Sequence, residues 1–280
     1  MRRYKGQRQI CFDGFTLDDF EREAISFLRE HEPPEGYFVG FSGGKDSIVT
    51  LQLVRMSGVK HTPFYTCTRI DPPEMYRFIK ANYPEIQWLY PKMTLWEGIR
   101  KKSPPLRMQR WCCDVLKKDP AKHIPLKNRV MGIRAEESTR RASRPRIDDF
   151  KKYGQKIYKP IFAWKEWQVW EFIEKYSLPY PSLYDEGFHR IGCVVCPFIL
   201  GTSSGKVRER TLSMQRWPGM WKALRHAVMD FYELKRRGRD WEKYRDAECF
   251  YQAYLNGFEN KEKWKCNTNS TGTTLNLLTP

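Results

Sequence analysis

The chain has 280 residues, with 50 lysine and arginine residues against 33 aspartate and glutamate residues, so its formal net charge at pH 7 is +17. Hydrophobic residues make up 40% of the sequence and aromatic residues 15%, which excludes collagen-like, low-complexity and disordered chains. We expect no membrane partner, because no apolar run approaches the roughly 20 residues of a membrane-spanning helix. The positive charge favours a nucleotide or nucleic acid over an acidic protein surface as partner, and charge that serves only solubility is the remaining alternative.

The cysteine content and the N-terminus predict a cytoplasmic location. Eight cysteines are too few for a disulfide scaffold in a chain of this length. The basic N-terminus, with Arg2, Arg3 and Lys5, is not followed by the apolar segment of a secretory signal. In a reducing compartment, clustered cysteines more often bind a metal or react than form structural disulfides.

Strand and helix patterns alternate over the first part of the chain. A helix is predicted over residues 16–31, where Thr16 is a suitable N-cap and Pro33 ends the pattern. Strands are predicted at residues 37–41, 61–66, 86–90 and 129–133, and helices at residues 46–57, 73–83, 94–102 and 115–118. This alternation is typical of an α/β protein with a doubly wound parallel sheet, whose ligands bind beyond the carboxyl ends of the strands.

Helical patterns predominate from about Trp164 onward. They cover residues 166–176, 214–235 and 241–256, with loops over residues 177–205. We therefore divide the chain into an N-terminal helical segment (1–35), an α/β domain (36–204), a helical C-terminal region (205–266) and a flexible tail (267–280).

The sharpest motif is a glycine-rich loop between a predicted strand and a predicted helix. Its residues are Ser42, Gly43, Gly44, Lys45, Asp46 and Ser47. Two glycines let backbone N–H groups turn toward a phosphate, and the following helix adds its positive N-terminal end. Lys45 adds a charge, and the two serines add hydroxyl donors. The four-residue gap of the Walker motif is missing, so we predict a phosphate-binding loop of another kind rather than a plain strand–helix turn.

Arginines are concentrated after the predicted strand at residues 129–133. They are Arg134, Arg140, Arg141, Arg144 and Arg146. Guanidinium groups can hold phosphate or sulfate through two parallel hydrogen bonds. Because this segment and the glycine-rich loop are expected at the same edge of the sheet, we favour ligand contact over a solvated basic loop.

Four cysteines form the second constellation. Cys112 and Cys113 are adjacent, and Cys193 and Cys196 form a CxxC motif followed by Pro197. CxxC presents two thiolates to one metal centre. Adjacent cysteines point in different directions, so a cubane cluster with separate iron corners accommodates them better than one tetrahedral zinc ion. We predict a 4Fe–4S cluster, with zinc and metal-free redox thiols as alternatives.

The motifs together resemble a known superfamily. The Ser42–Ser47 loop resembles the pyrophosphate loop of the ATP-pyrophosphatase (PP-loop) superfamily, whose fold is called adenine nucleotide alpha hydrolase-like. Three further segments, at residues 70–74, 132–141 and 160–170, resemble PAPS-reductase-like proteins. The cysteine pattern is similar to the 4Fe–4S ligand set of APS reductases and of the iron–sulfur proteins of DNA phosphorothioation.

This resemblance implies specific roles for residues. It places an adenine nucleotide, ATP or else PAPS or APS, on the loop, with Lys45 and Asp46 as catalytic residues and Mg²⁺ bound near Asp46. The cluster would be held by the four cysteines at 112, 113, 193 and 196. The nucleotide-binding set comprises Ser42, Gly43, Gly44, Lys45, Asp46, Ser47, Asp71, Gly132, Arg134, Glu137, Ser138, Arg140 and Arg141.

Two departures from the reductase pattern bear on the reaction. Sulfonucleotide reductases usually carry a degraded loop, whereas the loop here is intact, which fits cleavage of ATP. Their C-terminal nucleophile lies in a Glu-Cys-Gly-x-His context, whereas this chain has Glu248-Cys249-Phe250 and a separate Cys266 without a motif. We read Cys249 as a packed residue, with a nucleophilic role of Cys249 or Cys266 as the alternative. We read Cys11 and Cys67 as small core residues, with a role in the site as the alternative for Cys67.

Three functions follow from these observations. The first is an ATP pyrophosphatase that takes part in sulfur transfer with a 4Fe–4S cluster, with a nucleic acid as one candidate acceptor and a sulfur-donor or reductant protein as partner. The second is a PAPS or APS reductase. The third is a non-catalytic iron–sulfur sensor that binds a nucleotide or nucleic acid. Release of pyrophosphate rather than sulfite distinguishes the first from the second, and binding without turnover identifies the third.

Overall fold

The computed structural model describes residues 14–235 and 243–259. The chain forms two compact units, each built from two separate segments. Unit 1 comprises Met1–Lys92 and Cys113–Cys193, and unit 2 comprises Met93–Cys112 and Val194–Pro280. The chain therefore passes from one unit to the other after Lys92, Cys112 and Cys193.

Unit 1 contains a six-stranded sheet in the order β3-β2-β1-β4-β6-β5. Neighbouring strands are parallel except β5, which is antiparallel to β6. In chain order the strands are β1 (Tyr37–Gly40), β2 (His61–Thr66), β3 (Gln87–Leu89), β4 (Asn128–Met131), β5 (Ile147–Phe150) and β6 (Gln155–Tyr158). The prediction of an α/β fold with a mostly parallel sheet and a helical C-terminal region is confirmed.

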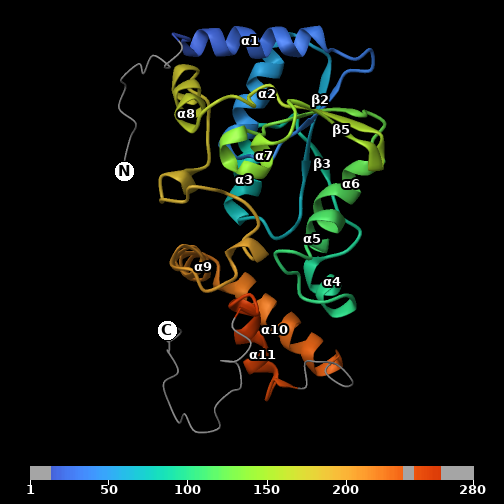
Figure 1. Cartoon of the computed structure of the whole chain (residues 1–280), viewed down its shortest axis with the longest axis vertical. Coiled ribbons are helices and arrows are strands. Elements are labelled where there is room, and N and C mark those ends of the chain that lie inside the picture. Colours follow the sequence, from blue (N-terminus) through green and yellow to red (C-terminus); the bar gives the residue numbers. More distant parts are fainter. Residues whose placement is uncertain (1–13, 236–242, 260–280) are drawn as a thin grey trace. The chain divides into compact units, whose positions relative to one another are not determined.

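Helices cover one face of this sheet. They are α1 (Leu17–Glu30), α2 (Lys45–Ser57), α3 (Pro73–Asn82) and α8 (Glu166–Lys175), and α1, α2 and α8 pack against one another (Figure 1). Thr16 caps α1 in a capping box with Asp19, which fixes where the helix begins. Alternate strand residues such as Val39 and Val130 join Phe172 of α8 in the large apolar core under these helices.

The opposite face is covered less completely. The segment between β3 and β4 contributes a π-helix (Asp114–Lys118) and the short α6 (Asp119–Lys122). Phe38, Phe64 and Ala121 form a small apolar cluster there, with the two phenyl rings stacked at a centroid distance of 4.5 Å. Polar side chains also reach this face, because β4 and β6 place Arg129 and Gln155 on it, followed by Lys159 just after β6.

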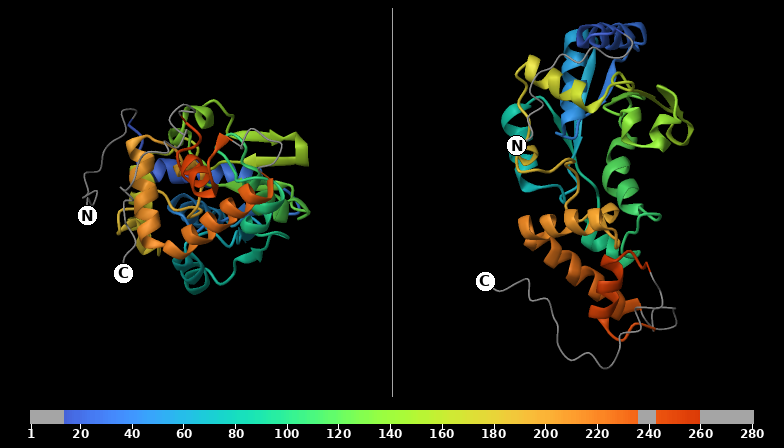
Figure 2. Two further views of the ribbon diagram at one scale, coloured as in Figure 1. Left: turned by 90° about the horizontal axis from the view of Figure 1, so that it is seen from below. Right: turned by 60° about the vertical axis from the view of Figure 1, so that its left-hand side comes forward.

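Unit 2 is helical. Its helices are α4 (Leu95–Lys101), α9 (Ser204–Arg216), α10 (Pro218–Lys235) and α11 (Ala247–Leu255), while α5 (Trp111–Cys113) crosses from this unit into unit 1. Helix α10 packs against α4 and α11 (Figure 2). Gly98 on α4 leaves room for the ring of Trp111, since a Cβ on Gly98 would lie 2.1 Å from that ring. Within the described ranges, no helix combines the length and the apolar character needed to cross a bilayer.

The structure corrects several of the predicted boundaries. The helix predicted at residues 214–235 is two helices, because Pro218 begins a new helix and α9 already begins at Ser204. The hairpin of β5 and β6 and the short helix α7 (Thr139–Ala142) lie where no element was predicted. Residues 115–118 form the π-helix rather than a regular α-helix. The predicted tail, Cys11 and Cys266 lie outside the described residues.

Candidate functional site

The glycine-rich loop closes tightly onto the N-terminus of α2. Gly43 has a φ of +74°, and a Cβ there would lie 2.5 Å from the terminal methyl of Met75, so only glycine fits. The Ser42 N–H donates to Ser47 Oγ at 3.1 Å, and Ser47 Oγ donates to the Gly44 carbonyl at 2.8 Å. These bonds hold the loop in one compact turn before the helix begins.

Two buried cations meet at Asp46. The Arg134 Nε donates to Asp46 Oδ1 at 2.6 Å, and Lys45 Nζ lies 3.5 Å from Asp46 Oδ2 and 3.4 Å from Glu166 Oε1. Burial lowers the pKa of Arg134, but Asp46 and then Glu136 outweigh it, so the pKa is raised and the group stays charged. Each cation thus has a carboxylate partner that an anionic ligand could replace.

Gly132 explains why Arg134 reaches the loop. A Cβ on Gly132 would lie 2.6 Å from the Asp46 carbonyl oxygen, a contact that no larger residue tolerates. The end of β4 therefore approaches α2 closely, and the chain emerging from it carries Arg134 to Asp46. The predicted residues Asp46, Gly132 and Arg134 are brought together in this way.

The Tyr184 hydroxyl covers the loop at Gly44 and Lys45. Its hydroxyl accepts a hydrogen bond of 3.0 Å from the backbone N–H of Lys45. The same oxygen lies 3.3 Å from the position that a Cβ on Gly44 would occupy. The ring packs edge-on against Trp170 of α8, with a centroid distance of 5.1 Å.

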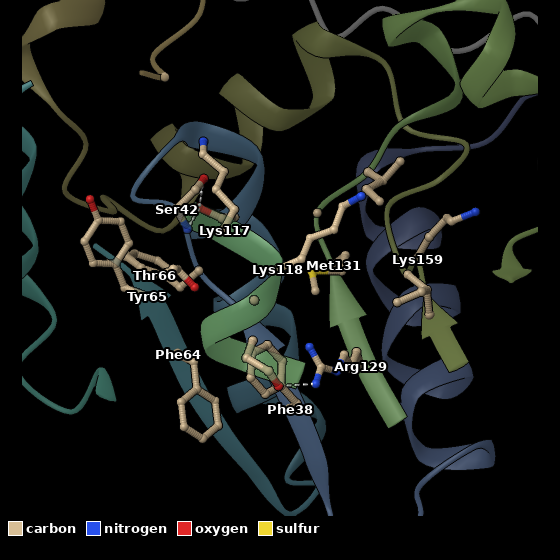
Figure 3. A pocket seen from close by; sticks show the side chains of 18 of the residues that line it. Phe38, Ser42, Phe64, Tyr65, Thr66, Lys117, Lys118, Arg129, Met131 and Lys159 are labelled. Carbon is tan, nitrogen blue, oxygen red and sulfur yellow. Dashed lines mark hydrogen bonds between the residues drawn. The ribbon is translucent and has the colours of Figure 1, made fainter. Parts of the chain in front are cut away.

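A cavity of about 530 Å³ opens next to the loop on the less covered face of the sheet. Of the predicted residues, it is lined by Ser42, Ser47, Asp71, Gly132 and Arg141. Its charged lining is mostly positive, with the cations Lys117, Lys118, Arg129, Arg141, Arg144 and Lys159 against the anions Asp71 and Asp148 (Figure 3). An anionic ligand suits this lining, and the volume is in the range typical of small-molecule sites, about 300–1,000 Å³.

Asp71 is held as a buried hydrogen-bond acceptor at the edge of the cavity. Its carboxylate accepts from the Tyr65 hydroxyl at 2.7 Å and from Thr68 Oγ1 at 2.9 Å. The Asp71 N–H donates to the Tyr76 hydroxyl at 3.1 Å. Burial and the adjacent Asp71 charge raise the pKa of Tyr65 far above its usual range, so the tyrosine stays a hydroxyl donor.

The remaining predicted residues surround the site without lining the cavity. Glu137 accepts from the Arg134 N–H at 3.1 Å and forms an ion pair with Arg141. Ser138 caps α7 by accepting from the Arg141 N–H. Arg140 is exposed. These contacts of Glu137 and Ser138 order residues 134–141, here called the arginine segment, after the end of β4.

The four cysteines fall into two pairs, one in each unit. In unit 1 the Cys193 sulfur raises the pKa of Lys117, and Asp71 and Cys113 act in the same direction. In unit 2 burial raises the pKa of Tyr254, and Cys112 and Cys196 add to that effect. Each unit therefore places one member of the Cys-Cys pair and one member of the CxxC motif near a common neighbour. Over the described ranges, no three histidine, cysteine or acidic side chains gather in a metal-binding arrangement.

Sequence reasoning missed several residues of the site, among them Tyr184, Glu166 and Arg129. Tyr184 and Glu166 contact Lys45 from segments more than 100 residues away, and no local pattern marks such contacts. Arg129 lies inside a strand, where the apolar residues around it indicated only a core strand. It is 4% exposed, donates to the Ala121 carbonyl at 2.6 Å and lies 4.4 Å from the ring centroid of Phe38. Burial lowers the pKa of Arg129 to about 10.

The sequence of the chain is similar to a known protein family and to other proteins. The model of a family described as "Phosphoadenosine phosphosulfate reductase domain" matches residues 36–198, more than half of the chain. An uncharacterized protein of Methanocaldococcus jannaschii is 28% identical over 245 residues, which cover 81% of this chain and 49% of that protein. The chain thus spans about half the length of that relative.

Two proteins named as sulfonucleotide reductases are also similar. An adenosine 5'-phosphosulfate reductase of Staphylococcus haemolyticus is 27% identical over 195 residues, which cover 66% of this chain and 80% of that enzyme. The crystal structure of phosphoadenylyl-sulfate (PAPS) reductase from Candida auris in a phosphate complex has 21% sequence identity and a TM-score of 0.49. That match covers 67% of this chain and 98% of the other.

Proposed function

Because the chain belongs to the phosphoadenosine phosphosulfate reductase domain family, we propose that it binds an adenine nucleotide with the phosphates at Ser42–Ser47. It cleaves ATP between the α- and β-phosphates, and the adenylyl group activates an acceptor for sulfur transfer. The observation that carries this proposal is the pairing of two buried cations, Lys45 and Arg134, with Asp46 at the N-terminus of α2.

The chemistry assigned to these residues is electrostatic. An acceptor oxygen attacks the α-phosphorus, and its proton passes to solvent. As the new O–P bond forms, the bond to the bridging oxygen breaks, and pyrophosphate leaves with that electron pair. Lys45 and the loop N–H groups stabilise the charge that develops on the leaving oxygen. A nucleophilic sulfur then displaces AMP from the adenylylated acceptor.

The carboxylates near Lys45 change partners when the nucleotide binds. Phosphate oxygens replace Asp46 and Glu166 as partners of Lys45, which leaves both carboxylates available. Asp46 is our candidate for binding Mg²⁺, because carboxylate and phosphate oxygens are its usual ligands. The arginine segment, with Arg134 and Arg141, would hold the remaining phosphate charge or an anionic acceptor such as a nucleic acid.

We propose that Cys112, Cys113, Cys193 and Cys196 bind a 4Fe–4S cluster. The chemistry of the donors suits such a cluster, since four cysteine sulfurs are its usual ligands and all four residues carry thiols, although the described structure does not itself gather them into a metal-binding group. Lys117, which lies near Cys193 and also lines the cavity, would balance the negative charge of the thiolates. The cluster would supply electron transfer or bind sulfur close to the activated acceptor.

Reduction of a sulfonucleotide is the second candidate. The similarity to an enzyme named adenosine 5'-phosphosulfate reductase and the cationic cavity favour it. This reaction also needs an accessible nucleophilic thiol, and Cys249 does not supply one, because it is 5% exposed on α11. The third candidate, a sensor without turnover, would use the same loop and cavity.

One experiment separates these candidates. Anaerobically purified protein is given ATP and Mg²⁺ or APS and a thiol reductant, and pyrophosphate and sulfite are measured. We expect pyrophosphate from ATP, and a loss of about 100-fold in Lys45→Ala, because a lost oxyanion contact costs that much. Lys222→Ala, at an exposed position on α10, is the control. Sulfite without pyrophosphate would establish the reductase, and tight nucleotide binding without either product would establish the sensor.

The cluster is tested on the same preparations. Iron and acid-labile sulfide should be present in the purified protein and lost in Cys113→Ser. Cys67→Ala is the matched control, since Cys67 is a buried thiol outside the proposed ligand set, and it should retain iron. Equal iron content in both variants, or zinc in place of iron, would contradict the assignment.

A further inference from the structure

The backbone N–H of Lys45 is a donor that a bound phosphate would be expected to use. It is the first N–H of α2, a helix of 13 residues, and N–H groups at a helix N-terminus have no partner within the helix. In this structure that N–H already has an acceptor, the Tyr184 hydroxyl, at 3.0 Å. An oxygen atom of the protein therefore lies where a phosphate oxygen would accept a hydrogen bond.

The tyrosine is held in this position by its surroundings. Its ring packs edge-on against Trp170 and lies 5.6 Å from Lys45 Nζ. Tyr184 ends a short 3-10 helix (Ser182–Tyr184) and precedes a turn in which the Gly187 N–H donates to the Tyr184 carbonyl. Burial raises the pKa of Tyr184, so at neutral pH the group is a hydroxyl.

The cavity reaches the loop at Ser42 and Ser47, whereas the Lys45 N–H is covered by Tyr184. A ligand with one phosphate that enters from the cavity would meet the two serines and would not need to displace the tyrosine. A ligand with two linked phosphates would have to reach farther along the loop, where it would compete for the Lys45 N–H.

We infer that Tyr184 is a specificity-determining residue. Its hydroxyl occupies the Lys45 N–H, and it must release this donor before a diphosphate-bearing ligand binds. This inference rests on the proposed function in taking phosphates as the ligands of the loop. It goes further by assigning an internal competitor, and it makes binding of pyrophosphate weaker relative to binding of a single phosphate.

The test compares two tyrosine variants by calorimetric titration with inorganic pyrophosphate and inorganic phosphate. Tyr184→Phe keeps the ring on Trp170 and removes the competing oxygen. Tyr180→Phe is the matched control, because Tyr180 also packs on Trp170 and its hydroxyl bonds to Asp185 rather than to the loop. Pyrophosphate should bind Tyr184→Phe about fivefold more tightly than the wild type, the effect of one net hydrogen bond, with phosphate affinity and Tyr180→Phe unchanged.

Unchanged or weaker pyrophosphate binding in Tyr184→Phe would overturn the inference, since the hydroxyl would then be neutral or a ligand contact. An equal gain for phosphate and pyrophosphate would overturn it as well. ATP turnover on the same samples separates this result from the proposed function. The tyrosine effect without pyrophosphate release from ATP rejects the reaction alone, and turnover without the tyrosine effect rejects the inference alone.

Discussion

The two faces of the sheet are made from the same strands but differ in what they bury. Under α1, α2, α3 and α8, alternate residues such as Val39 and Val130 join one continuous apolar core. On the opposite face the neighbouring positions carry Phe38 and Arg129 and then a cavity with cationic walls. One face thus stabilises the fold, whereas the other keeps buried charge that folding alone does not require.

The largest expected effect lies on the apolar face. Phe172 is fully buried and packs edge-on against Trp164 at a centroid distance of 5.6 Å. Phe172→Ala should lower the free energy of unfolding by about 3–5 kcal/mol, because a large cavity replaces the ring. Chemical denaturation measures this loss, and a change below about 1 kcal/mol would contradict the assignment of this face as the main source of stability.

Arg129 provides the counterpart on the cavity face. Its buried charge has an unfavourable environment, as the lowered pKa of about 10 indicates. Arg129→Met should therefore change the free energy of unfolding by less than about 1 kcal/mol, since relief of the buried charge offsets the lost hydrogen bond to Ala121. Binding of an anionic ligand should weaken in the same variant. A loss of stability as large as that of Phe172→Ala would remove the distinction between the two faces.

The smallest effect concerns the capping box of α1, at the outer edge of the apolar face. Hydrogen bonds from Thr16 lower the pKa of Asp19, and Arg22 contributes further. Because the folded pKa is below the unfolded value, the stabilisation is present at neutral pH and is lost as the pH falls through the folded pKa. Asp19→Asn should melt below the wild type near neutral pH, and the difference should disappear as the pH falls through the folded pKa of Asp19. A constant difference between the two melting temperatures would contradict this origin.

The apolar face and the glycine-rich loop could be predicted because their signals are local. Apolar runs mark β1 and β2, and two glycines before Lys45 mark a phosphate loop. The hairpin of β5 and β6 escaped prediction because Ile147–Phe150 contains two aspartates and reads as polar loop. The start of helix α9 was not predicted, because its buried residues are Arg210 and Ser213 and its apolar residues therefore show only a weak helical period.

The cavity face was harder to predict for a different reason. The contact between Lys45 and Tyr184 joins residues 139 positions apart, and it depends on how α8 and the segment after it pack. The place of Arg129 depends on strand register, which pairs it with Phe38 of β1 and Ile157 of β6. Such positions follow from the assembled sheet, and a single sequence carries no pattern that marks them.

The division of the chain has a practical consequence for expressing fragments. Residues 93–112 lie within the stretch matched by the family but belong to unit 2, where Leu95 and Ile99 of α4 are buried and Arg100 pairs with Asp230 of α10 at 2.9 Å. A fragment that stops at residue 198 would keep α4 and lose α10, which would expose those two side chains to water. The limits of the family match are therefore not the limits of a folding unit, and a shortened protein must retain α4 and α10 together.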